Sequence, residues 1–120
     1  MQVLVVEDDP MQRLNAIELL SDAGYVVADA DNADAAVQVI EGGWQGQVVV
    51  TDVHMPGTLN GSQLAETICK RWPTIGVVIL SGVLRPKPGD LPDESRFLAK
   101  PYEPARLKKM IEEVAAVHRS

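Results

Sequence analysis

The sequence predicts an α/β fold, a doubly wound parallel sheet of five strands with helices on both faces. Short apolar runs rich in valine alternate along the chain with longer segments whose apolar residues recur at helical spacing. This alternation is typical of a parallel sheet with crossover helices. The runs are apolar at successive positions, as expected for strands buried on both faces. Since the 120 residues contain no Pro/Gly/Ser-rich linker, we expect one domain over residues 1–120.

The first strand and the first helix have the clearest local signals. Residues 3–6, VLVV, form the first apolar run. The next helix is expected to begin after Asp9, a suitable N-cap, with Pro10 in its first turn, and to end near Gly24. Its apolar stripe is predicted to comprise Met11, Leu14, Ile17 and Leu20.

The remaining elements continue the alternation. Strands are expected at residues 25–28, 48–51, 77–80 and 97–99, and helices at 32–40, at 62–72 and from about 104 onward. The inner faces of the last two helices are predicted to comprise Leu64, Ala65, Ile68, Cys69 and Trp72 in one, and Leu107, Met110, Ile111, Val114 and Val117 in the other. Residues 84–95 contain three prolines, so the helix expected there, the fourth, is predicted to be degenerate, missing or reduced to a turn.

Composition and charge argue against several classes of function. The net charge of −6 disfavours direct nucleic-acid binding, which needs a basic surface. No apolar stretch approaches the roughly 20 residues of a membrane helix, and residues 1–6 lack a basic leader. Cys69 is the single cysteine, so it cannot form an internal disulfide and is predicted to be a buried apolar filler. We therefore expect a cytoplasmic protein with neither membrane nor nucleic-acid partners.

Polar residues follow the apolar strands at the points where the strands end. In chain order they are Glu7, Asp8, Asp9, Asp52, Ser81 and Lys100. Ligands of open parallel sheets bind beyond the carboxyl ends of the strands, so we expect these residues at one edge. Clustered carboxylates repel one another unless a cation intervenes, and a sparse set of oxygen ligands favours Mg²⁺. A bound cation together with Lys100 would suit an incoming phosphoryl group.

Each of these residues also has a purely structural interpretation. The acidic run could be a solvated turn that caps the first helix. Asp52 could be a loop acid, Ser81 a turn residue before Gly82, and His54 an exposed loop histidine. The shared position of the polar residues at one sheet edge is what favours a functional site. No Cys/His cluster suggests zinc, and no glycine-rich loop follows the first strand to bind a nucleotide.

Four motifs carry a family resemblance that covers the whole chain. LVVEDD ends the first strand, VVVTDVHMPG surrounds Asp52, VVILSG ends the fourth strand and FLAKPY lies at the fifth. In this order and spacing, the sequence resembles a response-regulator receiver domain of two-component signalling. The resemblance implies the flavodoxin-like form of the predicted fold.

The resemblance also implies which residues accept the phosphoryl group and hold the metal. Asp52 matches the phosphoacceptor. The implied Mg²⁺ ligands are Asp8, Glu7 acting through water, Asp52, and the backbone carbonyl of His54. Asp9 falls one position past the acidic pair, so it is expected to act only as a cap.

Further residues match the family's switch. Ser81 matches the hydroxyl that hydrogen-bonds the phosphoryl oxygen, and Phe97 matches the aromatic residue that moves inward. Lys100 matches the lysine that pairs with the same oxygen, aimed by a cis peptide bond to Pro101. The positions that tune the lifetime of the phosphoryl group are His54 and Val83.

The implied reaction is transfer of a phosphoryl group from the phosphohistidine of a sensor histidine kinase, or of a phosphotransfer protein, to Asp52. The added charge of roughly −2 would switch a protein–protein surface toward an unknown downstream protein, and a homodimer is one form this contact could take. Because the last helix ends near Ser120, a stand-alone receiver rather than an enzyme is expected. The N-terminal domain of a longer regulator is the alternative.

Two other functions compete with this interpretation. A degenerate receiver would bind a partner independently of phosphorylation, but it would not need the complete polar set at the sheet edge. A phosphohydrolase with an aspartyl nucleophile would need a second acid two residues after Asp52, where His54 stands. Neither explains the sequence as well as a phosphoryl-accepting receiver.

The sequence departs from the commonest form of the family in three places. The loop between Asp52 and Asn60 is one residue longer, and Phe97 lacks the hydroxyl of a tyrosine. The proline-rich residues 84–95 replace a helix of the usual output face. We hypothesise that this stretch is a flexible loop that becomes ordered on phosphorylation; unchanged amide exchange there with and without a phosphoryl analogue would count against the idea.

Overall fold

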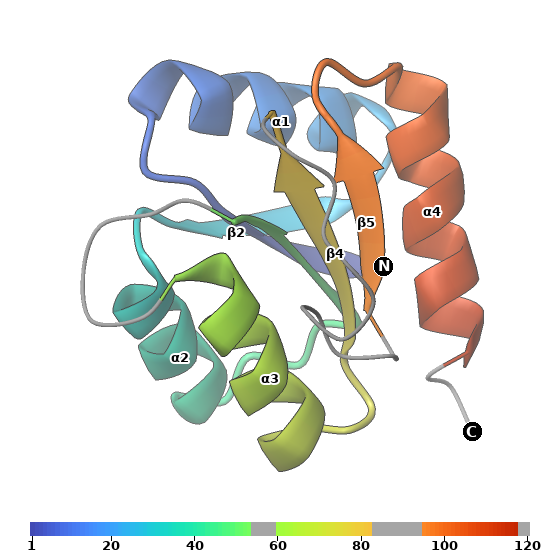
Figure 1. Cartoon of the computed structure of the whole chain (residues 1–120). Coiled ribbons are helices and arrows are strands. Elements are labelled where there is room, and N and C mark those ends of the chain that lie inside the picture. Colours follow the sequence, from blue (N-terminus) through green and yellow to red (C-terminus); the bar gives the residue numbers. More distant parts are fainter. Residues whose placement is uncertain (54–59, 83–94, 118–120) are drawn as a thin grey trace.

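The computed structural model describes residues 1–53, 60–82 and 95–117, and there the predicted α/β architecture is confirmed (Figure 1). Five parallel strands form one sheet in the order β2-β1-β3-β4-β5. The strands are β1 (Gln2–Val6), β2 (Val26–Ala30), β3 (Val48–Asp52), β4 (Gly76–Ser81) and β5 (Arg96–Ala99). The helices within the described ranges are α1 (Pro10–Asp22), α2 (Ala33–Glu41), α3 (Gly61–Arg71) and α4 (Pro104–Val117).

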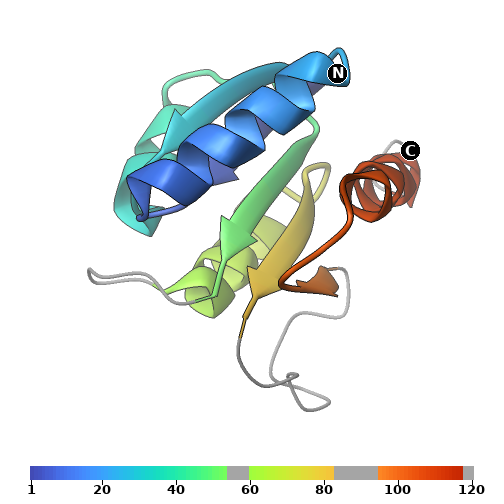
Figure 2. The same ribbon diagram turned by 90° about the horizontal axis from the view of Figure 1, so that it is seen from above.

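Helices cover both faces of the sheet (Figure 2). Helices α1 and α4 pack on one face, and α2 and α3 pack on the other. Successive strand residues point to opposite faces, so Val3 and Val5 of β1 join the first core while Leu4 and Val6 join the second. Each fully buried aliphatic side chain contributes roughly 1.5–3 kcal/mol. The continuous apolar runs are therefore required by a sheet that is buried on both sides.

The strand order places β1 and β3 side by side at the centre of the sheet. Val6 of β1 pairs with Ala30 of β2 on one side and with Thr51 of β3 on the other. The connection that leaves β1 runs to β2, whereas the connection that leaves β3 runs to β4, on the opposite side. A crevice between strands whose connections diverge is the usual ligand site of such sheets. The residues that follow β1 and β3 therefore face a common space.

The predicted stripe on α1 is wrong for two of its four residues. Met11 is 66% exposed and Leu14 is 48% exposed, while Ala16 and Leu20 form the buried face. Steps of three residues drift by about 60° each on a helix of 3.6 residues per turn. Across three such steps, Met11 arrives on the side of the helix opposite Leu20. Residues four apart, such as Ala16 and Leu20, stay on the buried side.

The inner faces predicted for the other two helices are confirmed, with one exception. In α3, the predicted residues are buried or half-buried, and Cys69 packs at the margin of the second core as a partly buried side chain. In α4, Leu107, Ile111 and Val114 are buried, whereas Val117, the last residue of the helix, is 59% exposed. The prediction that Cys69 is a buried apolar filler is thus confirmed only in part: the side chain packs against the second core but is partly buried.

The ends of the elements follow their local signals. Asp9 caps α1, and its carboxylate accepts hydrogen bonds from the backbone N–H groups of Met11 and Gln12. Asn60 and Gln63 form a reciprocal capping box at the start of α3. Trp72 is the C-cap of α3 rather than part of the helix. Two predictions fall almost wholly outside the described residues: the degenerate helix at residues 84–95, which is not α4, and the longer loop after Asp52.

Membrane insertion has no candidate segment in the described part of the chain, since none of the helices there is both long enough and apolar enough to cross a bilayer.

Candidate functional site

The predicted polar residues lie together at the carboxyl edge of the sheet. Glu7 and Asp8 follow β1, Asp52 is the last residue of β3, Ser81 is the last residue of β4, and Lys100 follows β5. The backbone N–H of Lys100 donates to the carbonyl of Ser81 at 2.8 Å, which ties the end of β5 to the end of β4. The prediction of a shared edge is therefore confirmed for the residues within the described ranges.

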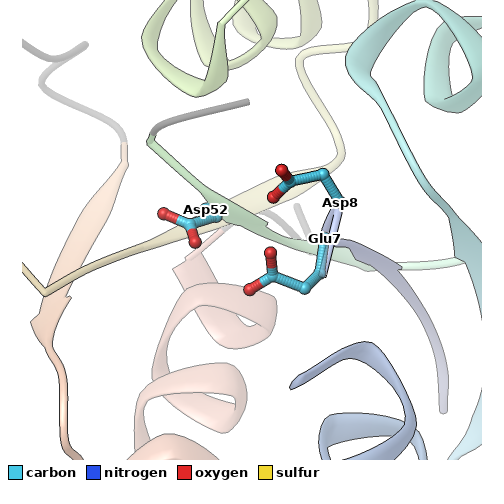
Figure 3. Close-up of side chains that lie close together, drawn as sticks. All are labelled: Glu7, Asp8 and Asp52. Carbon is cyan, nitrogen blue, oxygen red and sulfur yellow. The ribbon is translucent and has the colours of Figure 1, made fainter. Parts of the chain in front are cut away.

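Three carboxylates form a compact acidic cluster in the crevice between β1 and β3 (Figure 3). Ligand oxygens of Glu7, Asp8 and Asp52 all lie within 4.8 Å of one another. Glu7 is buried, Asp52 is half-buried and Asp8 is exposed, so the cluster opens to solvent on the side of Asp8. Hard oxygen donors in this number fit Mg²⁺, which keeps several waters in its shell. The donor set is thus suitable for the predicted ion.

Lys100 lies against the cluster and neutralises part of its charge. Its ammonium Nζ donates to Glu7 Oε1 at 3.0 Å, to Asp52 Oδ2 at 2.8 Å and to Gln12 Oε1 at 2.6 Å. The Lys100–Pro101 peptide bond is cis, as the resemblance implies. The ammonium therefore bridges the ends of β1 and β3 from the far edge of the sheet.

Burial and ion pairing shift the pKa values of two groups of the site, the Glu7 carboxyl and the Lys100 ammonium. Burial raises the pKa of the Glu7 carboxyl above its ordinary value of 4.5, and the hydrogen bond from Lys100 offsets only part of this effect. Burial alone would lower the pKa of Lys100, but the bonds and negative charges of Asp52 and Glu7 outweigh it, so the pKa of the ammonium is raised. Lys100 is consequently charged at neutral pH. Burial disfavours the ionised form of Glu7, so keeping this carboxylate charged lowers the stability of the folded protein.

Glu7→Gln is expected to stabilise the metal-free protein increasingly as the pH rises. A raised folded-state pKa means that stability is fully present below the unfolded value of 4.5 and is lost as the pH rises through the folded pKa. Since glutamine does not ionise, the gap between the urea midpoints of variant and wild type should begin to widen near pH 4.5 and level off once the pH passes the raised folded pKa. Unfolding titrations in a chelator measure this gap. A gap independent of pH would contradict the prediction, and Glu18→Gln on the exposed side of α1 is the control.

Ser81 and Phe97, matched to the family's switch together with Lys100, also lie within the described residues. Ser81 is buried, with 3% of its surface exposed. Phe97 is half-buried in β5, where it pairs with Ile79 of β4. Their switching roles stay predictions. His54 and Val83, matched to the lifetime-tuning positions and, for His54, to a metal ligand, lie outside the described residues.

Two supporting residues escaped the sequence-based prediction. Arg13 of α1 donates from Nη1 to the backbone carbonyl of Glu7 at 2.9 Å and pairs through Nε with Asp29 of β2 at 3.4 Å. This arginine fastens the acidic turn to the edge strand. Gly61 at the start of α3 lies so close to Asp52 that a Cβ there would collide with the Asp52 carbonyl. The position of Arg13 in the helix directly after the acidic run could have indicated its role from the sequence. No local sequence feature indicates the role of Gly61.

Gln12, the third acceptor of Lys100, was also missed. It belongs to the first turn of α1, directly after the acidic run, and a helix that begins at a site directs its first side chains toward that site. Its partner lies 88 positions away in the sequence. The contact is possible only because the fold brings the first turn of α1 and the turn after β5 to the same edge of the sheet.

Comparison with known proteins agrees with the fold. Residues 3–112 match the family model described as the response regulator receiver domain. The chain is 33% identical to the transcriptional regulatory protein FixJ of Bradyrhizobium diazoefficiens, covering 92% of this chain and 54% of FixJ. It is 30% identical to the sensor kinase CckA of Brucella abortus, covering 93% of this chain and 12% of CckA. It thus spans about half or less of these two curated relatives.

Other relatives are similar over nearly their whole length. The response regulator receiver protein CpdR of Brucella abortus is 27% identical, with 94% of this chain and 92% of CpdR covered. A solved response regulator receiver protein from Sinorhizobium medicae superposes with a TM-score of 0.91 at 23% identity, covering 98% and 96% of the two chains. Response regulator TrrA from Thermotoga maritima, solved in complex with Mg(2+)-BeF, superposes with a TM-score of 0.83 at 24% identity, covering 94% and 97%. These structural likenesses bear on the fold.

Proposed function

The chain belongs to the response regulator receiver domain family, and on that premise we propose that Asp52 is the residue that accepts the phosphoryl group. Receiver domains are signalling domains that interact with histidine kinases or phosphotransfer proteins. The observation that carries the proposal is the position of Asp52, whose carboxylate is shared between the acidic cluster and the Lys100 ammonium. Of the three clustered acids, Asp52 is the one that ends a central strand, where it lies beside the other two acids and the Lys100 ammonium.

The acidic cluster is proposed to bind Mg²⁺ through Asp8 and Asp52, with Glu7 acting through water. When bound, the ion would neutralise oxygens of the transferring phosphoryl group. Asp8 is the exposed member, so it offers the ion an entry from solvent. Glu7 is buried and hydrogen-bonded to the backbone N–H of Asp9 at 3.2 Å, which suits a fixed outer ligand.

The transfer itself requires little chemistry from the protein beyond positioning. A carboxylate oxygen of Asp52 attacks the phosphorus of a phosphohistidine, a P–O bond forms, and the P–N bond breaks with its electron pair leaving on the imidazole nitrogen. The product is an acyl phosphate on Asp52. Lys100, which donates to Asp52 Oδ2 in the unphosphorylated protein, can then donate to a phosphoryl oxygen.

Ser81 is proposed to hydrogen-bond the phosphoryl group, and Phe97 is proposed to follow it inward. Ser81 ends β4 next to β3, one strand away from Asp52, and its backbone already holds Lys100 in place. Phe97 is half-buried on the neighbouring strand, so a change in its burial would alter the surface near β5. We propose that a downstream protein, or a second copy of this chain, recognises that surface.

The exposed apolar residues of α1 supply a surface for the phosphodonor protein. Met11 and Leu14 lie in the first turns of the helix that follows the acidic run, and both are largely exposed. Apolar side chains beside an active site are a common feature of protein docking surfaces. We propose that a sensor kinase or phosphotransfer protein contacts these two residues while its phosphohistidine reaches Asp52.

The Met11→Glu/Leu14→Glu double variant is expected to slow phosphorylation by a histidine kinase at least tenfold, because two apolar contacts are replaced by charges. Phosphorylation by a small phosphodonor should stay unchanged. Transfer from a labelled kinase that phosphorylates the wild type measures the first effect. Val26→Glu is the control. Val26 is about as exposed as Met11, but it begins β2 and so lies at the end of the strand away from the carboxyl edge that holds the acidic cluster. Equal slowing by the control would contradict the proposed surface.

The proposed function is tested by incubating the protein with a small phosphodonor, such as acetyl phosphate or phosphoramidate, and measuring intact mass. One phosphoryl adduct is expected in the presence of Mg²⁺, and little or none in a chelator. The absence of an adduct under every condition would overturn the proposal. It would favour the alternative of a receiver that binds its partner independently of phosphorylation.

A further inference from the structure

We infer that Gln12 is a positioning residue, which holds the Lys100 ammonium at the site while Lys100 exchanges its carboxylate partners for the phosphoryl group. The inference rests on the proposed role of Asp52 as phosphoacceptor. It starts from the contact between Gln12 Oε1 and Lys100 Nζ, at 2.6 Å the shortest of the three hydrogen bonds that the ammonium makes.

The hydrogen-bonding capacity of Lys100 is fully used. A lysine ammonium has three donors and no acceptor, and the three donors go to Glu7, Asp52 and Gln12. Two of these acceptors are carboxylates of the acidic cluster, and the third is a neutral amide on α1. Gln12 is therefore the one partner of the ammonium that belongs to neither the metal cluster nor the phosphoacceptor.

The orientation of the Gln12 amide is determined by its two neighbours. Its Nε2 lies 3.5 Å from Oδ2 of Asp9, and the Asp9 carboxylate also caps the helix through the backbone N–H of Gln12. Lysine can only donate and an ionised aspartate can only accept. A flipped amide would place donor against donor and acceptor against acceptor, so only one orientation satisfies both neighbours. The helix cap thus aims the amide oxygen at Lys100.

Phosphorylation converts one of the three acceptors, a bound cation would engage the second, and the third stays in place. The Asp52 carboxylate becomes an acyl phosphate, and Glu7 is needed by the metal cluster. The bond to Gln12 involves neither change, so it can persist through the reaction. A lysine side chain is a flexible four-carbon stem that loses considerable rotamer freedom when it is held in place. A persistent anchor keeps the ammonium within reach of the incoming phosphoryl oxygen.

Gln12→Met tests the anchor, because methionine has similar length and helix propensity but no oxygen acceptor. At saturating Mg²⁺ and acetyl phosphate, the variant should be phosphorylated roughly tenfold more slowly, the factor expected for one hydrogen bond to a charged group. Gln12→Glu keeps an acceptor at the same reach and should restore the rate to within about threefold of wild type. In a Lys100→Met background, Gln12→Met should have no further effect.

A second measurement needs neither metal nor phosphodonor. In metal-free protein labelled with ¹⁵N-lysine, the ammonium protons of Lys100 should exchange with water several-fold faster in Gln12→Met than in wild type. The Lys100→Met protein identifies the signal. Gln38→Met, the same substitution at an exposed position of α2, is the matched control and should change neither exchange nor phosphorylation.

The outcomes separate this inference from the proposed function. Wild-type rates and unchanged Lys100 exchange in Gln12→Met would overturn the role of Gln12, as would an equal slowing in the Lys100→Met background. A wild-type protein that forms no adduct would overturn the proposed function, and the exchange measurement would still test the anchor. Slower phosphorylation, faster exchange, rescue by Gln12→Glu and loss of the effect without Lys100 would together support it.

Discussion

Asp52→Ala is expected to abolish the phosphoryl adduct completely. The other two acids of the cluster cannot replace it, because Glu7 is buried and hydrogen-bonded to the backbone N–H of Asp9, and Asp8 lies on the solvent side. Asp52 alone ends a central strand next to the Lys100 ammonium. Intact mass after incubation with acetyl phosphate and Mg²⁺ measures the effect, and circular dichroism checks that the variant is folded.

Asp31→Ala is the control for this result. Asp31 follows β2 at the same edge of the sheet, but it is exposed, hydrogen-bonds its neighbour Asn32 and lies outside the acidic cluster. Its removal should leave the adduct intact. Full phosphorylation of the Asp52→Ala protein would assign the acceptor to another residue, and the proposed mechanism would then be wrong at its central step.

Asp8→Asn is expected to weaken Mg²⁺ binding by about a hundredfold. Even groups that only orient a metal ligand cost 10–100-fold in affinity when they are replaced, and Asp8 is proposed as a direct ligand. The substitution also removes one negative charge from a cluster whose ligand oxygens lie within 4.8 Å of one another. Calorimetric titration with MgCl₂ measures the affinity, and phosphorylation at increasing Mg²⁺ should recover as the weakened site fills.

Asp9→Asn is the matched control for Asp8→Asn. The two residues are adjacent, both are exposed, and both substitutions remove one charge, but Asp9 lies outside the cluster and caps α1. Asparagine is also a good N-cap, so the helix should be preserved. Mg²⁺ affinity should change less than about threefold, because an exposed charge outside the site is screened. Similar losses in both variants would mean that general charge, rather than coordination, explains the effect.

The strands and the residues at their carboxyl ends could be predicted because the information is local. A run such as Val48-Val49-Val50 is compatible with few environments other than a strand buried on both faces. Once the strands are identified, parallel packing brings Asp8, Asp52 and Lys100 to one edge whatever the details of packing. The predicted apolar face of α1 was wrong because local spacing alone does not decide which side of a helix is buried. Apolar residues three apart suggested one face, and the helix buried the small Ala16 in place of Met11.

By itself, therefore, the sequence determined the sheet, the edge at which its polar residues meet, and the suitability of that edge for a cation and a phosphoryl group. The tertiary structure alone decided which atoms touch there: the amide of Gln12 on the ammonium of Lys100, the guanidinium of Arg13 under Glu7, and the glycine backbone against Asp52. The physical reason is reach. Strand ends follow from a few neighbouring residues, whereas the partner of a long side chain depends on which distant segments the fold brings to the same edge of the sheet.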